Sequence, residues 1–166
     1  MTTTDKILDS APVAHYRRFK MDRPKLTNEL ISATAAAFCE ANGWDADQAA
    51  DLARVCRNAH MDGYELAKEL DSMCGWMPTA QDVETLDNFG YDLREALRQA
   101  CIAWARDNNV HPPLPVGTMT TQGEITGIYA HDGACYEIRK PGDTEPTRRY
   151  IVRFEDAREA PAAVAG

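Results

Sequence analysis

Apolar residues recur at spacings of three and four through residues 27–108, which is typical of amphipathic helices. Thr27 is placed to cap the first helix, which we expect to run to about Ala41. Gly43 follows as its C-terminal stop, because glycine adopts the left-handed conformation that ends many helices. The pattern therefore predicts a helical N-terminal region.

Two further helix starts carry the signature of a capping box, in which a short polar side chain is followed three residues later by Glu or Gln. Asp45 with Gln48 predicts the second helix, and Asp62 with Glu65 predicts a short third helix that Gly75 ends. A Gly-Trp pair ends the first and third helices, and a capped helix follows each pair. We interpret both tryptophans as core residues at helix corners.

The fourth predicted helix is the longest, from Thr79 to about Asn108. Gly90 interrupts its apolar seam, so we expect a kink or break there, or close packing of another helix. We favour packing within one bundle over a coiled-coil dimer, which needs more heptads. The seam residues are Val83, Leu86, Gly90, Leu93, Leu97, Ala100 and Trp104.

After the proline run from Pro112 to Pro115, which cannot continue a helix, apolar and polar residues alternate with the period of two that is typical of strands. Alternating segments separated by turn residues predict three or four antiparallel strands. These segments are 125–129, 136–139 and 150–154. We therefore predict an α+β chain, with an N-terminal bundle of about four helices followed by a small antiparallel SH3-like β-barrel or meander.

This pattern divides the 166 residues into four regions. We expect a flexible basic arm that is either solvated or binds a partner or phosphate, then an acidic helical domain, a small β domain and a disordered tail. The corresponding ranges are 1–25, 26–110, 114–157 and 158–166.

Charge is distributed unevenly along the chain. Residues 26–110 hold six Lys and Arg against fifteen Asp and Glu, a net charge of −9, whereas residues 111–166 hold six against eight. Such a charge repels nucleic-acid phosphates and suits a basic protein or a nucleic-acid-binding complex. The acidic face is either a solvated surface or the partner-binding surface; its residues are Glu65, Glu69, Asp71, Asp82, Glu84, Asp87, Asp92 and Glu95.

The compartment is predicted from the cysteines and from the lack of targeting segments. Five widely spaced cysteines without a CxxC pair argue against a disulfide framework and against a zinc site. The first residues do not form a signal peptide, and no apolar run is long enough to cross a membrane. We expect a cytoplasmic protein, in the host cytoplasm if it is phage-encoded, with no membrane association.

Three residue groups could carry chemistry, and each also has a structural interpretation. Cys56 and His60, four apart on the second predicted helix, have the spacing of a metal-ligand pair but no second pair follows. His60 with Asp62 and Glu65 resembles an acid–base cluster, although a capping box already explains both carboxylates. We favour the structural interpretation of both groups.

The third group is Cys135, which lies near His131 and Asp132 and could act as a nucleophile. A strand cysteine lacks the helix-terminal setting that stabilises a thiolate, so we favour a buried thiol here too. We therefore predict no metal, no cofactor and no enzymatic activity.

Aromatic residues in the predicted strands could form a contact surface on the β domain or fill its core. Tyr129, Tyr136 and Tyr150 are the candidates for contact, and Phe154 belongs to the same aromatic group. Because a small β domain must fill its own interior, we favour core filling for most of them.

The β region resembles SH3-like small barrels of the KOW and Tudor type. The resemblance rests on Val116–Thr118, Gly123–Tyr129, Tyr136–Ile138 and Tyr150–Asp156, in which a glycine-bounded hairpin precedes a final strand that ends in acidic residues. The whole chain also resembles, in size and acidity, the short accessory proteins of phages, including anti-CRISPR proteins.

Three function hypotheses follow from these observations. The first is a non-enzymatic protein-binding factor, an inhibitor of a host nucleic-acid-guided defence complex that acts through the acidic face. The second is a nucleic-acid-associated adaptor that uses the KOW-like barrel and the basic arm, although the charge disfavours direct nucleic-acid binding by the helices. The third is an enzyme with an unrecognised site. Partner identity and oligomeric state stay open.

Overall fold

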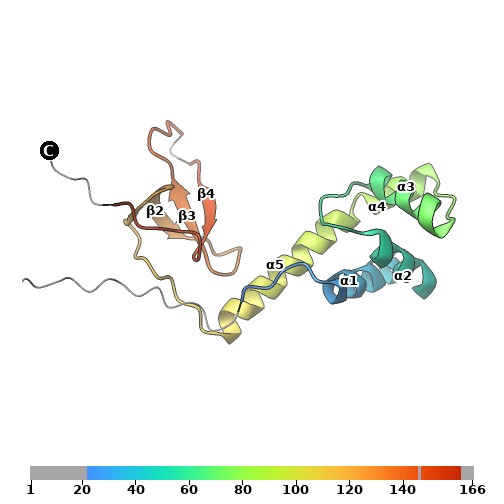
Figure 1. The fold of residues 1–166 in the computed structure, drawn as a ribbon. Coiled ribbons are helices and arrows are strands. Elements are labelled where there is room, and N and C mark those ends of the chain that lie inside the picture. Colours follow the sequence, from blue (N-terminus) through green and yellow to red (C-terminus); the bar gives the residue numbers. More distant parts are fainter. Residues whose placement is uncertain (1–21, 146, 162–166) are drawn as a thin grey trace, which may run out of the picture.

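The computed structural model describes residues 22–145 and 147–161, and shows an α+β chain in which a helical cluster and an antiparallel sheet lie toward opposite ends of one long helix (Figure 1). The helices are α1 (Asn28–Ala41), α2 (Ala46–Val55), α3 (Gly63–Cys74), α4 (Ala80–Leu86) and α5 (Phe89–Asp107).

The predicted helix starts are confirmed by their hydrogen bonds. The Thr27 hydroxyl accepts from the Leu30 amide at 3.3 Å. Both capping boxes, at Asp45 before α2 and at Asp62 before α3, have their reciprocal bonds in place. Each start is therefore determined by residues within three positions of it.

The fourth predicted helix is two helices. α4 ends at Leu86 and α5 begins at Phe89, so the predicted break is confirmed slightly before Gly90. Gly90 is buried, and a Cβ atom placed on it would lie 3.1 Å from the carbonyl oxygen of Ala59. Close packing and a change of helix direction therefore occur together at this point.

The core of the helical cluster takes residues from all five helices. Its aromatic members form a chain of edge-on contacts, with ring centroids 5.3 Å apart for Phe38 and Phe89, 5.8 Å for Phe38 and Trp44, and 5.6 Å for Trp44 and Trp76. The two Gly-Trp corners thus meet in space. Both tryptophans are only partly buried and pack against the core, whereas the sequence predicted that they lie inside it.

The sheet is an antiparallel meander of the order β1-β2-β3-β4, which is one of the two predicted arrangements. Its described strands do not close into a barrel. The strands are β1 (Met119–Thr120), β2 (Gly123–Ile128), β3 (Cys135–Arg139) and β4 (Tyr150–Arg153).

After β4 the chain returns to β1. Thr120 and Glu159 form an isolated antiparallel bridge, and the Ala160 amide donates to the Met119 carbonyl at 2.9 Å. The β module therefore extends beyond its predicted end at residue 157, into the first residues of the predicted tail. Residues 162–166 of that tail lie outside the described residues.

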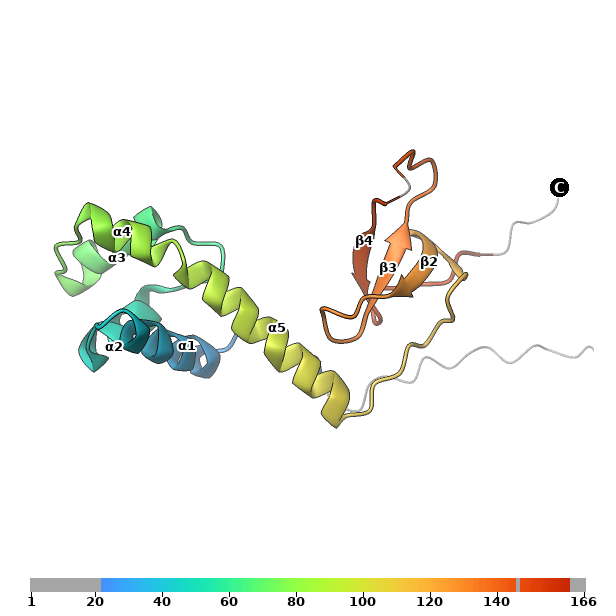
Figure 2. The ribbon, with the colours of Figure 1, turned by 180° about the vertical axis from the view of Figure 1, so that it is seen from behind.

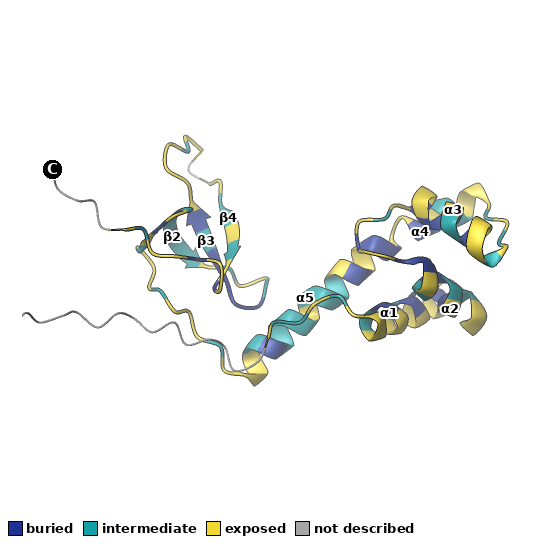
Figure 3. Ribbon diagram, viewed as in Figure 1, coloured by how far each residue is buried: buried dark blue, intermediate teal, exposed yellow. Residues whose placement is uncertain are grey.

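Helix α5 belongs to both cores. Phe89 and Leu93 are buried in the helical cluster, whereas Trp104 is buried with Tyr136 and Phe154 in the β module. Figure 3 shows mostly intermediate burial along the middle of this helix and exposed residues at its C-terminal end, beyond Trp104. The physical boundary between the modules therefore lies inside α5 rather than at the proline run.

The segment 22–27 forms a strap that runs along α5 in Figure 1 and passes behind this helix in the opposite view of Figure 2. Leu26 packs against the core of the helical cluster, and the Pro24 carbonyl contacts the Cys101 thiol of α5. Residues 1–21 of the predicted basic arm lie outside the described residues. The strap therefore links the two modules a second time.

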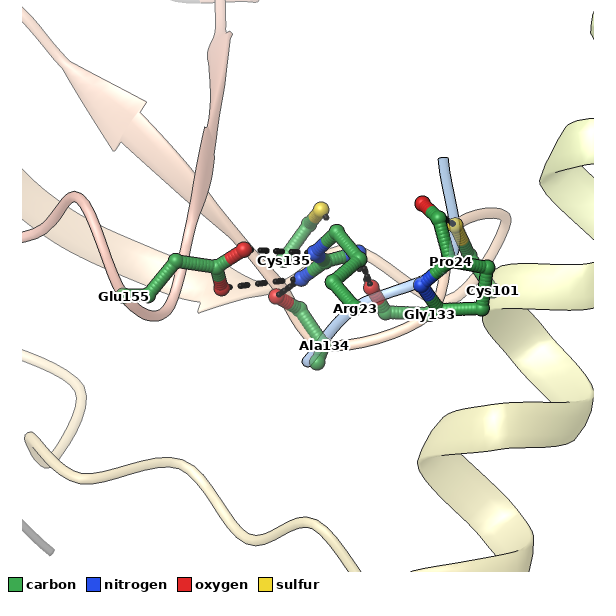
Figure 4. Close-up of polar contacts among 7 residues, drawn as sticks. All are labelled: Arg23, Pro24, Cys101, Gly133, Ala134, Cys135 and Glu155. Carbon is green, nitrogen blue, oxygen red and sulfur yellow. Dashed lines mark hydrogen bonds and ion pairs between the residues drawn. The ribbon is translucent and has the colours of Figure 1, made fainter. Parts of the chain in front are cut away.

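Arg23 ties this strap to the β module (Figure 4). Its guanidinium forms an ion pair with Glu155 at 2.6 Å and donates to the carbonyl oxygens of Gly133 at 2.6 Å and Ala134 at 2.8 Å. The same group lies 5.2 Å from the ring centre of Trp104. Burial works to lower the pKa of Arg23, but Glu155 together with the Cys135 and Cys101 thiols outweighs burial, and the pKa is raised.

Candidate protein-binding surface

The eight predicted acidic residues fall into three groups. In the first group, the carboxylates accept backbone amides near helix starts: Glu65 from Asp62, Asp82 from Thr79 at 2.8 Å, and Asp87 from Gly63 at 2.6 Å. Carboxylates in such positions are stabilised as anions by the helix dipole and the amide donors. These three side chains therefore help to build the fold, because each satisfies a backbone amide at a helix start.

The second group is paired with arginine. Glu69 forms an ion pair with Arg57 at 2.9 Å, and Glu95 forms one with Arg98 on the same helix. The hydrogen bond from Arg98, with a further one from Gln99, lowers the pKa of Glu95 to about 2. These two positions contribute little net charge to the surface, because a cation accompanies each carboxylate.

The third group consists of Asp71 on α3, Glu84 on α4 and Asp92 on α5, and all three are exposed. The acidic face is therefore spread over three helices, with its exposed carboxylates separated by capping carboxylates. The sequence predicted the charge of this surface. It did not separate the paired acidic residues from the exposed ones, because the pairing of Glu69 with Arg57 depends on tertiary structure.

The turn between α3 and α4 carries a hollow that the sequence analysis did not identify. The hollow has a volume of about 240 Å³ and is lined by Gln48, Trp76, Met77, Pro78 and Asp82. We call these five residues the Trp76 corner. Met77 is 91% exposed, and Met73, just before the turn, is 54% exposed.

The position of Trp76 is set by its contacts. The indole N–H donates to the carboxylate of Asp51 on α2 at 3.0 Å, and Asp51 also accepts from Arg54 at 3.0 Å. Arg54 in turn contacts the Cys74 thiol at 2.9 Å. α2 is therefore linked to the turn that follows α3. A signal for this site is present in the sequence, since Met77 is a large apolar residue outside both flanking helices.

A second, wider hollow of about 900 Å³ lies along α1 and α2. Five alanines line it, together with Trp44, and Glu40, Asp45 and Arg54 are among its polar residues. It offers a shallow apolar surface bordered mainly by acidic side chains. Trp44 lines this hollow and packs edge-on against Trp76, so each hollow is lined by one member of a tryptophan pair.

The three candidate tyrosines of the β module differ in their surroundings. Tyr136 is fully buried, and its hydroxyl bonds to both the amide and the carbonyl of Leu114, so it is a core residue and not a contact residue. Tyr129 and Tyr150 are half-buried. Phe154 is buried against Tyr136, with ring centroids 4.4 Å apart, as core filling predicted.

Tyr150 lies at the end of the β3–β4 hairpin among basic side chains. The Lys140 ammonium is 3.8 Å from its ring centre, and the Arg148 guanidinium is 5.4 Å away. Cations over an aromatic face are attracted by the negative charge of that face. The hairpin end is therefore a small basic patch, in contrast to the acidic helical cluster.

The geometry does not support the proposed cysteine chemistry. Cys135 is buried and donates to the Gly133 carbonyl at 3.5 Å; burial raises the pKa of its thiol, which opposes thiolate formation. His131 is exposed, and its ring packs 5.4 Å from that of Tyr129. Cys135 is thus a core residue of the β module, as the favoured interpretation predicted.

The Cys56 and His60 pair is not on one helix. α2 ends at Val55, Cys56 is the residue after it, and His60 lies exposed in the following loop. The expected placement on the second helix was therefore wrong. Within residues 22–145 and 147–161, no three His, Cys, Asp or Glu side chains are grouped as metal ligands would be.

In the part of the chain that the structure describes, none of the helices has the length and apolar character needed to cross a membrane. No protein-family model matches the chain, and neither the curated proteins nor the solved structures contain a match to it.

Proposed function

We propose that this chain is a non-enzymatic protein-binding factor whose acidic helical cluster binds a basic partner. The observation that carries the proposal is the segregation of charge. Residues 26–110 have six basic and fifteen acidic side chains, and Asp71, Glu84 and Asp92 are exposed on three neighbouring helices. Complementary charge raises the rate of association and selects partners of opposite sign.

The partner class that we propose is a host nucleic-acid-guided defence complex. Such complexes hold nucleic acid in positively charged channels, and a surface of exposed carboxylates can compete for them by mimicking phosphates. The resemblance to short phage anti-defence proteins supports this choice. The protein would then act as an inhibitor by occupying the channel.

The test begins with affinity capture from host lysate, followed by reconstitution with the purified partner and measurement of Kd. We expect a basic nucleic-acid-binding complex whose Kd rises by at least about tenfold between about 50 and 500 mM salt, because salt screens exposed charges. A partner without a basic channel, or binding that salt does not change, would contradict the proposal.

A charge-matched pair of variants locates the surface. The triple variant Asp71→Asn, Glu84→Gln, Asp92→Asn removes three exposed carboxylates of the helical cluster, and we expect it to slow association. The control Glu145→Gln, Asp156→Asn, Glu159→Gln removes the same charge from exposed residues of the β module. An equal decrease of the association rate in both variants would show that net charge, and not the position of the carboxylates, determines binding.

A second candidate function is suggested by the basic end of the β3–β4 hairpin. We propose that the β module is related to SH3-like barrels of the KOW type, a relation supported by the return of the chain to β1 through the Thr120–Glu159 bridge. Lys140 and Arg148 around Tyr150 provide the positive charge and the ring that nucleic-acid contacts use.

This candidate is tested by fluorescence anisotropy with a labelled single-stranded oligonucleotide at low salt. Binding that the double variant Lys140→Gln, Arg148→Gln abolishes would support an adaptor role. The control Arg106→Gln, Arg158→Gln removes equal charge from other exposed positions. No affinity for RNA or DNA at low salt would remove this candidate.

A further inference from the structure

The turn between α3 and α4 exposes apolar side chains that the fold does not use. Gly75 ends α3 in a left-handed conformation, and Thr79 caps α4, so the Trp76–Pro78 segment joins two separately capped helices. Met77 is 91% exposed and Met73 is 54% exposed. Met77 also lines the hollow, and exposed methionines are common at protein-binding surfaces.

The size of the hollow limits what it can bind. At about 240 Å³ the Trp76 corner is smaller than the pockets of roughly 300–1,000 Å³ that hold whole small-molecule ligands. A single large side chain is a better fit, and its apolar part can contact Trp76, Met77 and Pro78, while Gln48 and Asp82 form the polar part of the lining. The hollow is therefore suited to an anchor residue of a larger partner.

One wall of the hollow is fixed and the other is adaptable. Trp76 is held by its hydrogen bond to Asp51 and by its edge-on contact with Trp44, which continues through Phe38 into the core. Met77 is an unbranched thioether that can change its shape to fit different neighbours. A rigid wall lowers the entropy cost of binding, and a methionine beside it tolerates variation in the anchor.

The charges around the hollow select the kind of partner. Asp82 lines it, and Asp47 precedes Gln48 on α2, whereas Asp51, which contacts the indole of Trp76, contributes little net charge because Arg54 accompanies it. The nearby Arg54 is already paired with Asp51. An acidic peptide or an anionic lipid surface would be repelled, and a second copy of this chain would bring another cluster of charge −9 against this one.

We propose that the Trp76 corner binds a large apolar anchor residue carried by a Lys- and Arg-rich segment of the partner. This inference rests on the proposed protein-binding function and deepens it, since it assigns both an apolar contact and a basic flank to one site. Acidic residues elsewhere on the cluster would steer the approach, and the anchor would determine how long the complex lasts.

Two synthetic Lys- and Arg-rich helical peptides test the proposal, one with leucine and one with serine at its apolar positions. Binding to the full chain is measured by calorimetry, and the indole N–H resonances of Trp76 and Trp104 report where the peptide binds. We expect the leucine peptide to bind at least about tenfold more tightly, since burying an apolar anchor contributes more than one factor of ten. The Trp76 resonance should shift most, that of Trp44, which packs against Trp76, should shift less, and that of Trp104 should not shift.

Two methionine variants provide the matched comparison. Met77→Ser should weaken binding of the leucine peptide by about five- to tenfold and leave the serine peptide unchanged. Met119→Ser, at a residue of the β module that is 51% exposed, should change neither. Because both methionines are exposed, neither substitution should unfold the protein, and unchanged circular dichroism checks this.

The possible results separate this inference from the proposed function. If both peptides bind equally well and salt weakens both, the acidic surface is supported and the anchor site is overturned. If neither peptide binds at low salt, both proposals fail. An equal loss of affinity for the leucine peptide in the two methionine variants would also overturn the assignment of a basic partner segment to this hollow. Self-association that depends on Met77, measured by sedimentation, would overturn it as well.

Discussion

The core cluster of the helical region contains fifteen buried residues, whereas that of the β module contains seven, and one of those seven, Trp104, comes from α5. The helical cluster starts its first four helices with side-chain caps of its own. The β module instead depends on parts of the chain outside its strands, namely Trp104, the Arg23 strap and the return segment at Glu159.

This difference shows how a sheet with short strands gains stability. A few short strands cannot bury enough apolar surface on their own. The approach of Gly133 to α5 illustrates the dependence, since a Cβ atom on Gly133 would lie 2.2 Å from the Cys101 carbonyl oxygen. We therefore expect the helical cluster to respond most to core substitutions and the β module to substitutions at its contacts with α5 and the strap.

The largest effect is expected from Phe89→Ala in the helical core. It removes a fully buried ring that packs against Phe38, and should lower the free energy of unfolding by about 3–5 kcal/mol. Amide hydrogen exchange should show most of the lost protection in α1 to α4. Phe89→Leu is the milder control. Equal loss in the sheet would mean that the two regions unfold as one unit.

A smaller but more local effect is expected from Arg23→Ala. The substitution leaves Glu155 and two carbonyl groups without their charged donor, and should cost the β module about 2–3 kcal/mol. The control is Arg139→Ala, which breaks an exposed pair with Glu124 and should cost no more than about 1 kcal/mol. Chemical denaturation followed by exchange of sheet amides measures both; similar losses would contradict the role of the strap.

Tyr136→Phe should reduce β-module stability by about 1–2 kcal/mol, because the Leu114 amide and carbonyl both lose the buried hydroxyl as a partner. Tyr129→Phe, at a half-buried tyrosine, is the matched control and should be close to neutral. Thermal unfolding measures the difference. An equal effect at both positions would argue against the specific contribution of the Leu114 contact.

The smallest effect is a pH dependence confined to the β module. Burial works to raise the pKa of Glu155, but Arg23 and other donors outweigh it and the pKa is lowered. A lowered pKa in the folded state means that Glu155 adds stability above its unfolded value of about 4.3 and loses this contribution as the pH falls below it. The stability difference between wild type and Glu155→Gln should therefore shrink between pH 7 and pH 3; a constant difference would contradict this.

Much of the fold could be predicted because its signals are local. Asp45 and Gln48, like Asp62 and Glu65, interact within one helical turn, so their spacing is sufficient to place a helix start. The alternation of apolar and polar residues likewise predicted the strands. The placement of His60 failed because α2 ends at Val55, earlier than its apolar pattern suggested.

The candidate surface could be predicted only in part. The charge of the helical region follows directly from composition, but the pairing of Glu69 with Arg57 and the exposure of Met77 do not. The hollow beside Trp76 forms from residues of α2, α4 and the turn before α4, which are brought together only when the cluster packs.

The amino-acid sequence by itself determined where the helices begin, that strands follow the proline run, and that negative charge is concentrated in the helices. These properties depend on neighbours a few residues apart. Only the tertiary structure decided that α5 serves two cores, that Arg23 bonds to Glu155 across 132 positions, and that Trp44 meets Trp76. Such contacts join segments that are far apart in the sequence and depend on how the elements pack. The local spacing of apolar residues therefore does not predict them.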